Sequence, residues 1–137
     1  MSLFRVFAVS GSALRAQTVR LNTTASNMAN TDSISSSTAT TYRARQPVFA
    51  TQLDAAGNEA EVAGVDVLGI VESQAPLRRE YRPDHPLAHP QGYVSLPNVN
   101  PVEEMANMIS ASRSYQSNVE VLNTSKQMLM RTLALGD

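Results

Sequence analysis

Two histidines are the residues whose type and spacing first suggest chemistry. His85 and His89 lie four residues apart, and Asp84 precedes the first of them. On a helix this spacing would place both imidazoles on one face, where they could bind a metal ion. Pro86 and Pro90 each follow a histidine, however, and they exclude a regular helix there. We therefore expect two loop histidines, with no metal site and no cofactor.

Acid–base or nucleophilic catalysis has few candidate residues. Glu103 and Glu104 are adjacent, so on a helix their carboxylates would point about 100° apart and would not converge on one substrate. Ser112 and Tyr115 fall within one helical turn, but no histidine or lysine lies close enough in sequence to activate them. The sequence also contains no phosphate-binding loop and no dinucleotide fingerprint. It therefore favours a protein without catalytic activity.

Composition excludes several further classes of protein. Hydrophobic residues make up 42% of the chain, which argues against wholesale disorder, but aromatic residues make up only 5%. The net charge of -1 provides no general attraction to nucleic acid. The absence of cysteine excludes disulfides and zinc–thiolate sites. No apolar run approaches the ~18 residues of a membrane span, so we expect neither a nucleic-acid partner nor direct membrane insertion.

The elements that position these side chains begin with a long helix over residues 3–30. Two interleaved series with a spacing of seven run along it: Phe7, Leu14, Leu21 and Met28, and Phe4, Gly11, Thr18 and Ala25. Such spacing is typical of a coiled-coil seam. Phe4 and the first series are therefore expected to contact another helix or another subunit, although Gly11 and Thr18 make the seam irregular.

A second long helix is predicted from residue 101 to residue 135, ended by Gly136. Asn100 is the expected N-cap, Pro101 suits the first helical position, and Glu103 can reach back as in a capping box. Its two series are Met105, Ser112, Val119, Lys126 and Leu133, and Met108, Tyr115, Leu122 and Leu129. The seven apolar or aromatic members are expected to form its part of the helix or subunit seam.

The middle of the chain predicts short strands and loops. A loop rich in Ser and Thr is followed by strands at 42–53, where Pro47 indicates an edge, and at 62–73. A turn at 54–60, a proline-rich connector and a short strand in "GYVSL" complete this region. The predicted fold is α+β, with the long helices paired as a coiled-coil-like inner domain and a small β-rich inserted outer domain. The expected parts are the N-terminal helix at 1–31, a Ser/Thr-rich strap at 32–41, the outer insertion at 42–97 and the C-terminal helix at 98–137.

Two asparagines stand near the end of the first helix. Asn30 falls where the helix should end, and Asn tolerates the left-handed conformation that closes helices. Asn27 lies inside the helix, where a stop signal does not explain it. We therefore predict that the Asn27 side chain hydrogen-bonds a backbone or side chain of a neighbouring helix or subunit.

Several motifs carry a resemblance to a known family. The segment "SGSALRAQTVRLNTTASNMANTDS" resembles the N-terminal region of flagellar axial (rod and hook) proteins, whose signature "ASN-x-AN" falls here at 25–30. The phrases "PNVN", "EEM", "ASRSYQ" and "NVEVLN", with "ESQAP" and "HPLA…GYV" in the middle, are similar to the proximal-rod branch of that family. The likeness covers nearly the whole chain. One departure is "SSSTATT" before Tyr42, which leaves the course of the strap open.

The resemblance implies a structural subunit of the bacterial flagellar basal body, located in the periplasmic rod. It would be exported by the flagellar type III apparatus without a cleaved signal peptide. It would polymerise with itself and with rod proteins FlgB and FlgF, with FliE and FlgG as further candidates. The product would be a hollow drive shaft that transmits torque, with the paired helices around the export channel. A periplasmic enzyme acting on peptidoglycan and an adaptor of a related secretion machine are the alternatives.

Overall fold

The computed structural model describes residues 3–54 and 61–136. The elements are α1 (Leu3–Ala29), β1 (Arg45–Asp54), β2 (Glu61–Glu72), β3 (Arg78–Tyr81), β4 (Tyr93–Leu96) and α2 (Pro101–Leu135). The strands form two antiparallel pairs, β1–β2 and β3–β4. The two long helices and the small sheets confirm the predicted α+β class. The turn predicted at 54–60 lies almost entirely outside the described residues.

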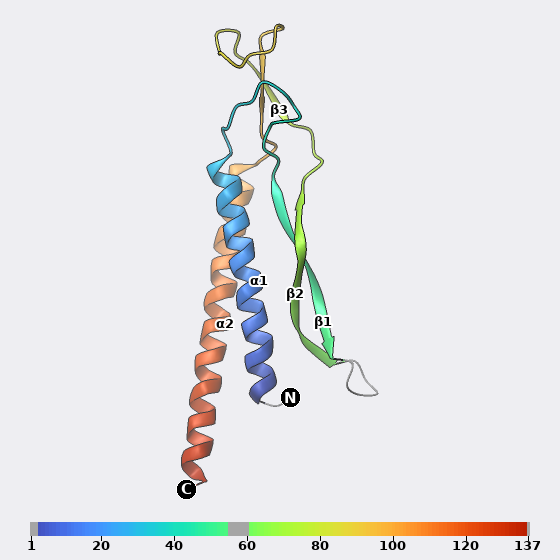
Figure 1. Cartoon of the computed structure of the whole chain (residues 1–137). Helices are drawn as coiled ribbons and strands as arrows, with labels where there is room; N and C mark the ends of the chain where they lie inside the picture. Colours follow the sequence, from blue (N-terminus) through green and yellow to red (C-terminus); the bar gives the residue numbers. More distant parts are fainter. Residues whose placement is uncertain (1–2, 55–60, 137) are drawn as a thin grey trace.

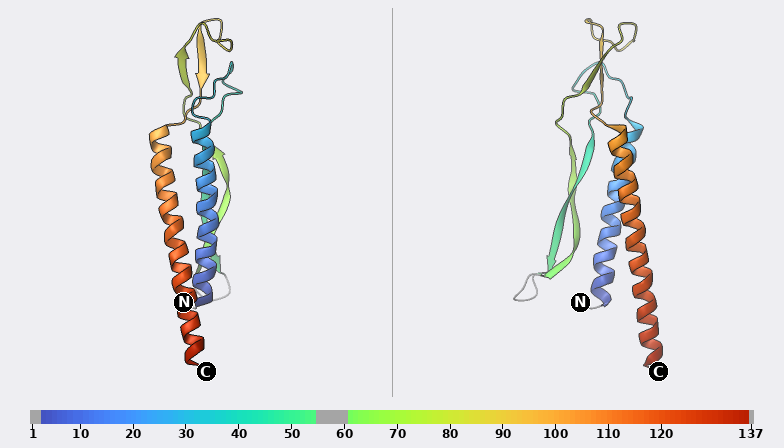
Figure 2. Two further views of the ribbon diagram at one scale, coloured as in Figure 1. Left: turned by 90° about the vertical axis from the view of Figure 1, so that its left-hand side faces the viewer. Right: turned by 180° about the vertical axis from the view of Figure 1, so that it is seen from behind.

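The molecule is elongated, and α1 is its middle layer. The two helices run side by side in opposite directions, and the β1–β2 hairpin runs along the other side of α1 (Figures 1 and 2). Among the described helices and strands, α2 contacts α1 alone, whereas α1 also contacts β1 and β2. Because α2 has 35 residues and α1 has 27, the C-terminal end of α2 extends beyond the start of α1.

Asn100 begins α2 as its N-cap. Its backbone is extended, with φ -100° and ψ 109°, and its Oδ1 accepts hydrogen bonds from the N–H groups of Val102 at 3.1 Å and Glu103 at 3.5 Å. Among the described residues, no hydrogen bond runs from the Asn100 N–H to the Glu103 carboxylate, so the expected capping box is not formed. The exposed carboxylate of Glu103 therefore favours this helix end through its charge.

The end of α1 differs from the expected geometry. The helix ends at Ala29, next to Asn30, but no described residue other than glycine has a positive φ. The left-handed conformation predicted for Asn30 is therefore wrong. Instead, Asn30 Nδ2 donates to the Ser26 carbonyl at 2.8 Å. The Asn27 carbonyl accepts from the Asn30 N–H and the Thr31 hydroxyl, both at 3.2 Å, and the Met28 carbonyl accepts from the Thr31 N–H at 3.3 Å. These bonds satisfy carbonyls of the last turn without a left-handed cap.

The β1–β2 hairpin lies close against α1 at Gly64. Ser12 Oγ on α1 accepts a hydrogen bond from the Val65 N–H on β2 at 3.0 Å. A Cβ atom added at Gly64 would lie 2.5 Å from this same Ser12 Oγ. Only glycine therefore permits this approach of β2 to α1. The hairpin has only two strands, so both are edge strands, as Pro47 in β1 indicates.

The strap at 32–41 is held by the β3–β4 hairpin. The backbones of Ser35 and Ser95 exchange two hydrogen bonds, at 3.1 and 3.3 Å, which attach the strap to β4. Arg78 donates to the Thr31 carbonyl at 2.7 Å and to the Pro97 carbonyl at 3.0 Å. Arg78 lies on β3, a strand that the sequence did not predict.

Candidate assembly interface

Asn27 is the centre of a polar junction between α1 and β1. Its side chain is only 1% exposed. Its Oδ1 accepts from the Arg45 N–H at 2.9 Å and from the Tyr42 hydroxyl at 2.8 Å, while its Nδ2 donates to the Arg45 carbonyl at 2.8 Å. The carboxamide therefore pairs with both backbone groups of one residue, as the peptide group of a neighbouring strand would. This pairing fixes the start of β1 against α1.

Glu104 extends the junction to α2. It is 6% exposed, and burial raises the pKa of its carboxyl above the ordinary value of 4.5. Hydrogen bonds from Asn27 and Thr24 lower the pKa and the charge of Glu103 raises it, but burial dominates. The bonds of Asn27 to β1 were not predicted, and a contact of its side chain with a neighbouring helix or subunit stays a prediction. Nearby, Arg20 Nη2 on α1 donates to Asn107 Oδ1 on α2 at 3.2 Å.

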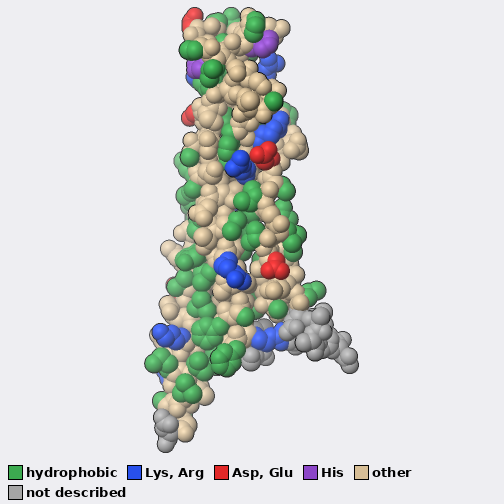
Figure 3. Space-filling model, in the orientation of Figure 1, with side chains coloured by type: hydrophobic (Ala, Val, Ile, Leu, Met, Phe, Trp, Pro, Cys, Tyr) green, Lys and Arg blue, Asp and Glu red, His purple; other side chains and the backbone are tan. Residues whose placement is uncertain are grey.

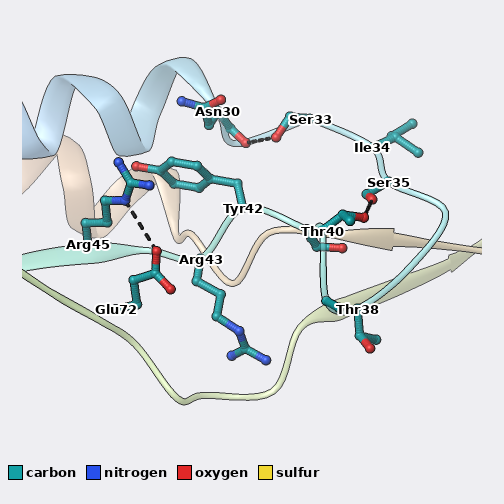
Figure 4. Close-up of a pocket in the computed structure, with 12 residues that line it drawn as sticks. Asn30, Ser33, Ile34, Ser35, Thr38, Thr40, Tyr42, Arg43, Arg45 and Glu72 are labelled. Atoms are coloured by element: carbon teal, nitrogen blue, oxygen red, sulfur yellow. Dashed lines mark hydrogen bonds and ion pairs between the residues drawn. The ribbon is translucent and has the colours of Figure 1, made fainter.

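A recess beside the strap has a volume of about 720 Å³ and a mostly polar lining (Figure 4). Its charged side chains already have partners. Arg45 pairs with Glu72 at 3.6 Å and lies over the Tyr42 ring, 5.2 Å from its centroid. Arg43 Nη1 donates to the carbonyls of Ser73 at 3.1 Å and Ala75 at 3.2 Å. The recess therefore presents no activated acid, base or nucleophile.

The two histidines each stabilise a loop turn. The Nδ1 atom of His85 accepts from the Leu87 N–H at 3.1 Å, and that of His89 accepts from the Gln91 N–H at 3.4 Å. Within 3–54 and 61–136, no group of three or more His, Cys, Asp or Glu side chains could hold a metal ion. In the same residues, no helix has the length and apolarity needed to cross a membrane.

Small and polar side chains occupy the contact between the two helices. On α2 the buried residues are Glu104, Ala111 and Ser125, and Ala111 is 0% exposed. These positions precede by one residue the expected series that begins at Met105. Met105 and Leu133, from that series, are 53% and 64% exposed. Small side chains let the helix axes approach closely, and larger ones then project outward.

The side chains of the remaining predicted seam residues are partly or largely exposed, which leaves surface that another subunit could contact. Phe4 is 72% exposed and Tyr115 is 37% exposed. The others are half-buried: Phe7, Leu14, Leu21, Met28, Met108, Val119, Leu122 and Leu129. Within this chain these residues do not form a closed apolar seam. Their role in contacts between subunits stays a prediction.

Large apolar side chains also cover much of the outer surface. On the hairpin, Leu53 is 57% exposed and Leu68 is 69% exposed, and on α2, Ile109 is 56% exposed and Met130 is 60% exposed. The space-filling view shows such side chains along the lower part of the molecule (Figure 3). Large apolar side chains that gather on an exposed face mark interaction sites. The fold and its surface thus define a class of protein, the subunit of a larger assembly.

Comparison with known proteins identifies that assembly. Residues 7–33, in α1 and the start of the strap, match the family model "Flagella basal body rod protein". Residues 91–135, from β4 through α2, match the model "Flagellar basal body rod FlgEFG protein C-terminal". The flanking helices are therefore those of the flagellar rod proteins.

Full-length relatives narrow the family further. The chain is 53% identical to the flagellar basal-body rod protein FlgC of Salmonella typhimurium and to that of Escherichia coli O6:H1, in each case over 99% of both chains. It is 43% identical to FlgC of Buchnera aphidicola subsp. Acyrthosiphon pisum over the whole of both chains. The chain belongs to the FlgC family of flagellar basal-body rod proteins.

Some residues of the interface were not found by sequence reasoning. Ser10, Gln17, Thr24 and Thr31 also recur at a spacing of seven, as do Glu104, Ala111, Asn118 and Ser125. Most of these are buried, but their small or polar character does not attract attention in a search for apolar seams. The pairing of Asn27 with Arg45 joins residues 18 positions apart, and no local spacing encodes it.

Proposed function

We propose that this chain is a structural subunit of the proximal flagellar rod, and that it polymerises with itself and other rod proteins into the hollow shaft that transmits torque. The observation that carries the proposal is the distribution of side chains, with small and polar residues between the helices and large apolar residues outside. A heterologous interface that does not close generates a helical assembly. Each Leu, Met or Phe covered by a neighbour would contribute roughly 1.5–3 kcal/mol.

The arrangement of layers supports an inner and an outer part. The helices at 1–31 and 98–137 would pair as a coiled-coil-like inner domain around the export channel. The insertion at 42–97 would form the outer domain, with the strap at 32–41 between them. The position of the β1–β2 hairpin along the opposite side of α1 from α2 is consistent with this division.

The proposal extends to partners and location. FlgB and FlgF would be the neighbouring subunits besides further copies of this chain, with FliE and FlgG as additional neighbours. The flagellar type III apparatus would export the chain, without cleavage of a signal peptide, to the basal body in the periplasm. The small apolar core, whose buried members are Ala16, Ala44, Val94, Leu96, Val99 and Ala111, supports folding that is completed on assembly. No observation favours the enzyme or the adaptor as a second function.

Two experiments test this function. Circular dichroism of the purified monomer is expected to show less helix than the assembled protein contains; fully formed helices with cooperative melting would contradict folding on assembly. In cells that lack the native protein, a chain without residues 1–10 is expected to give no rods in electron micrographs of basal bodies. Normal rods from that truncated chain would contradict the role of the N-terminal seam.

A further inference from the structure

A groove at the β3–β4 end of the molecule has features that the assembly contacts described above do not use. It has a volume of about 340 Å³ and lies between the strap and the β3–β4 hairpin. Three hydroxyl side chains of the strap form one side: Ser36, Ser37 and Thr38. Arg79, His89 and Tyr93 form the other side. The bridge between Ser35 and Ser95 fixes the distance between the two sides.

The Arg79 guanidinium is held in place by a stack of aromatic rings. It lies over the Tyr93 ring, 5.3 Å from its centroid. The Tyr81 ring packs edge-on against Tyr93, with centroids 5.3 Å apart and an interplanar angle of 63°. Tyr81 in turn covers Gly92, where an added Cβ would lie 2.5 Å from the Tyr81 ring and φ is +86°. The stack therefore positions Arg79 before any ligand binds.

The groove presents hydrogen-bond donors without a compensating acid. Arg78 and Arg82 lie near Asp32 and Glu80, at 3.8 and 2.9 Å, but no carboxylate of the described residues lies within ion-pairing distance of Arg79. His89 Nδ1 accepts from the Gln91 N–H at 3.4 Å, which leaves Nε2 as the ring nitrogen that a ligand could reach. The backbone N–H of His89 donates to the Tyr93 carbonyl at 2.8 Å, which holds the His89 backbone beside the two tyrosine rings.

We propose that this groove binds a carboxylate side chain of a neighbouring rod protein, with Arg79 as the principal contact. A guanidinium presents two parallel N–H donors that match a carboxylate, and the hydroxyls of the strap add further donors. The charge complementarity favours an acidic segment as the occupant. Its origin in another protein subunit rests on the proposed function, because rod neighbours are then the chains that surround this end.

Zero-length cross-linking tests the proposal in isolated basal bodies. Arg79→Lys retains the charge and places a primary amine in the groove, where a carbodiimide can join it to a bound carboxylate. Arg82→Lys is the matched control, because its amine faces Glu80 of the same chain and should form an internal link. Arg79→Gln removes the amine and the charge. Mass spectrometry then identifies the residues joined to position 79.

The proposal predicts a link from position 79 to an Asp or Glu of another rod subunit in the Arg79→Lys basal bodies, and none with Arg79→Gln. Absence of that link, with the Arg82→Lys internal link formed, would overturn the proposal. A link to a carboxylate of a cell-wall peptide would also overturn the assignment to a protein partner. If the unchanged chain is absent from isolated basal bodies, the proposed function fails. If it is present and position 79 still forms no link in the Arg79→Lys variant, only the proposal for this groove fails.

Discussion

The carboxamide of Asn27 pairs with both backbone groups of Arg45, its Nδ2 lying 2.8 Å from the carbonyl oxygen and its Oδ1 lying 2.9 Å from the nitrogen. The Asn27 side chain, in the last turns of α1, thus forms with Arg45 the two hydrogen bonds that the backbone of a neighbouring strand would form. Glu104 on α2 lies close enough for this carboxamide to lower the pKa of its carboxyl, against the larger effect of burial. The end of α1 and the start of β1 are therefore joined through one residue that is almost fully buried.

Asn27→Ala should weaken this junction. It leaves the Arg45 N–H and carbonyl without their partner, and buried unpaired groups cost roughly 1–3 kcal/mol each. We expect a lower urea concentration for release of half of this chain from isolated basal bodies, measured by gel electrophoresis of the released protein. Asn22→Ala, at an exposed position of the same helix, is the control. Equal midpoints for the two variants would contradict a central role for Asn27.

Glu104 should give the assembled chain a specific pH dependence. Burial raises the pKa of its carboxyl in the folded chain, so the folded state holds the proton more tightly than the unfolded state. The contribution of Glu104 is therefore most favourable below its unfolded pKa, and it declines as pH rises from about 4.5 through the raised value.

Glu104→Gln should remove that decline. We compare the urea concentrations at which half of the chain is released from basal bodies. The Glu104→Gln chain should exceed the unchanged chain in this midpoint by more at pH 8 than at pH 4.5. Glu103→Gln, an exposed neighbour, is the matched control and should show a smaller difference. A pH difference for Glu104→Gln no larger than that for the control would show that the buried carboxyl does not determine this dependence.

Gly64→Ala should displace the hairpin from α1. The added Cβ would lie 2.5 Å from Ser12 Oγ and 3.2 Å from Gln52 Oε1, and overpacking of this kind costs roughly 1–3 kcal/mol. Gly69→Ala is a close control, because Gly69 has the same φ of 158° and an added Cβ there meets nothing within 4 Å. We expect Gly64→Ala to lower the urea release midpoint more than Gly69→Ala does. The reverse order would contradict the close packing of Ser12 against β2.

The sequence predicted the helices well because their signals are local. The series through Phe7 and Leu21 and the cap at Asn100 place both helices within a residue or two of their observed bounds. The buried face of α2 was harder to predict. The seven-residue series in the sequence is marked by large apolar residues such as Met105, while the buried residues of α2 are small or polar, such as Ala111 and Ser125.

The candidate interface was partly predictable for a similar reason. A buried role for Asn27 could be inferred because a helix stop did not account for it. Its pairing with Arg45 could not be inferred, because it depends on how α1 and β1 pack against each other. The strand β3 was missed because its four residues pair only with β4 and have no alternating apolar pattern of their own.

The central claim is that large apolar side chains lie outside because neighbouring subunits cover them. Ile109 is 56% exposed on α2. Ile109→Asp should therefore disrupt contacts between subunits while leaving the contacts within the chain intact. Ser110→Asp introduces the same charge at the next exposed position and is the matched control.

The most direct measurement is the fraction of basal bodies with a complete rod, counted in electron micrographs from cells whose only copy of this chain carries either variant. The account predicts that rods are lost with Ile109→Asp and largely retained with Ser110→Asp, at equal amounts of exported protein. Complete rods at the normal frequency with Ile109→Asp would contradict it.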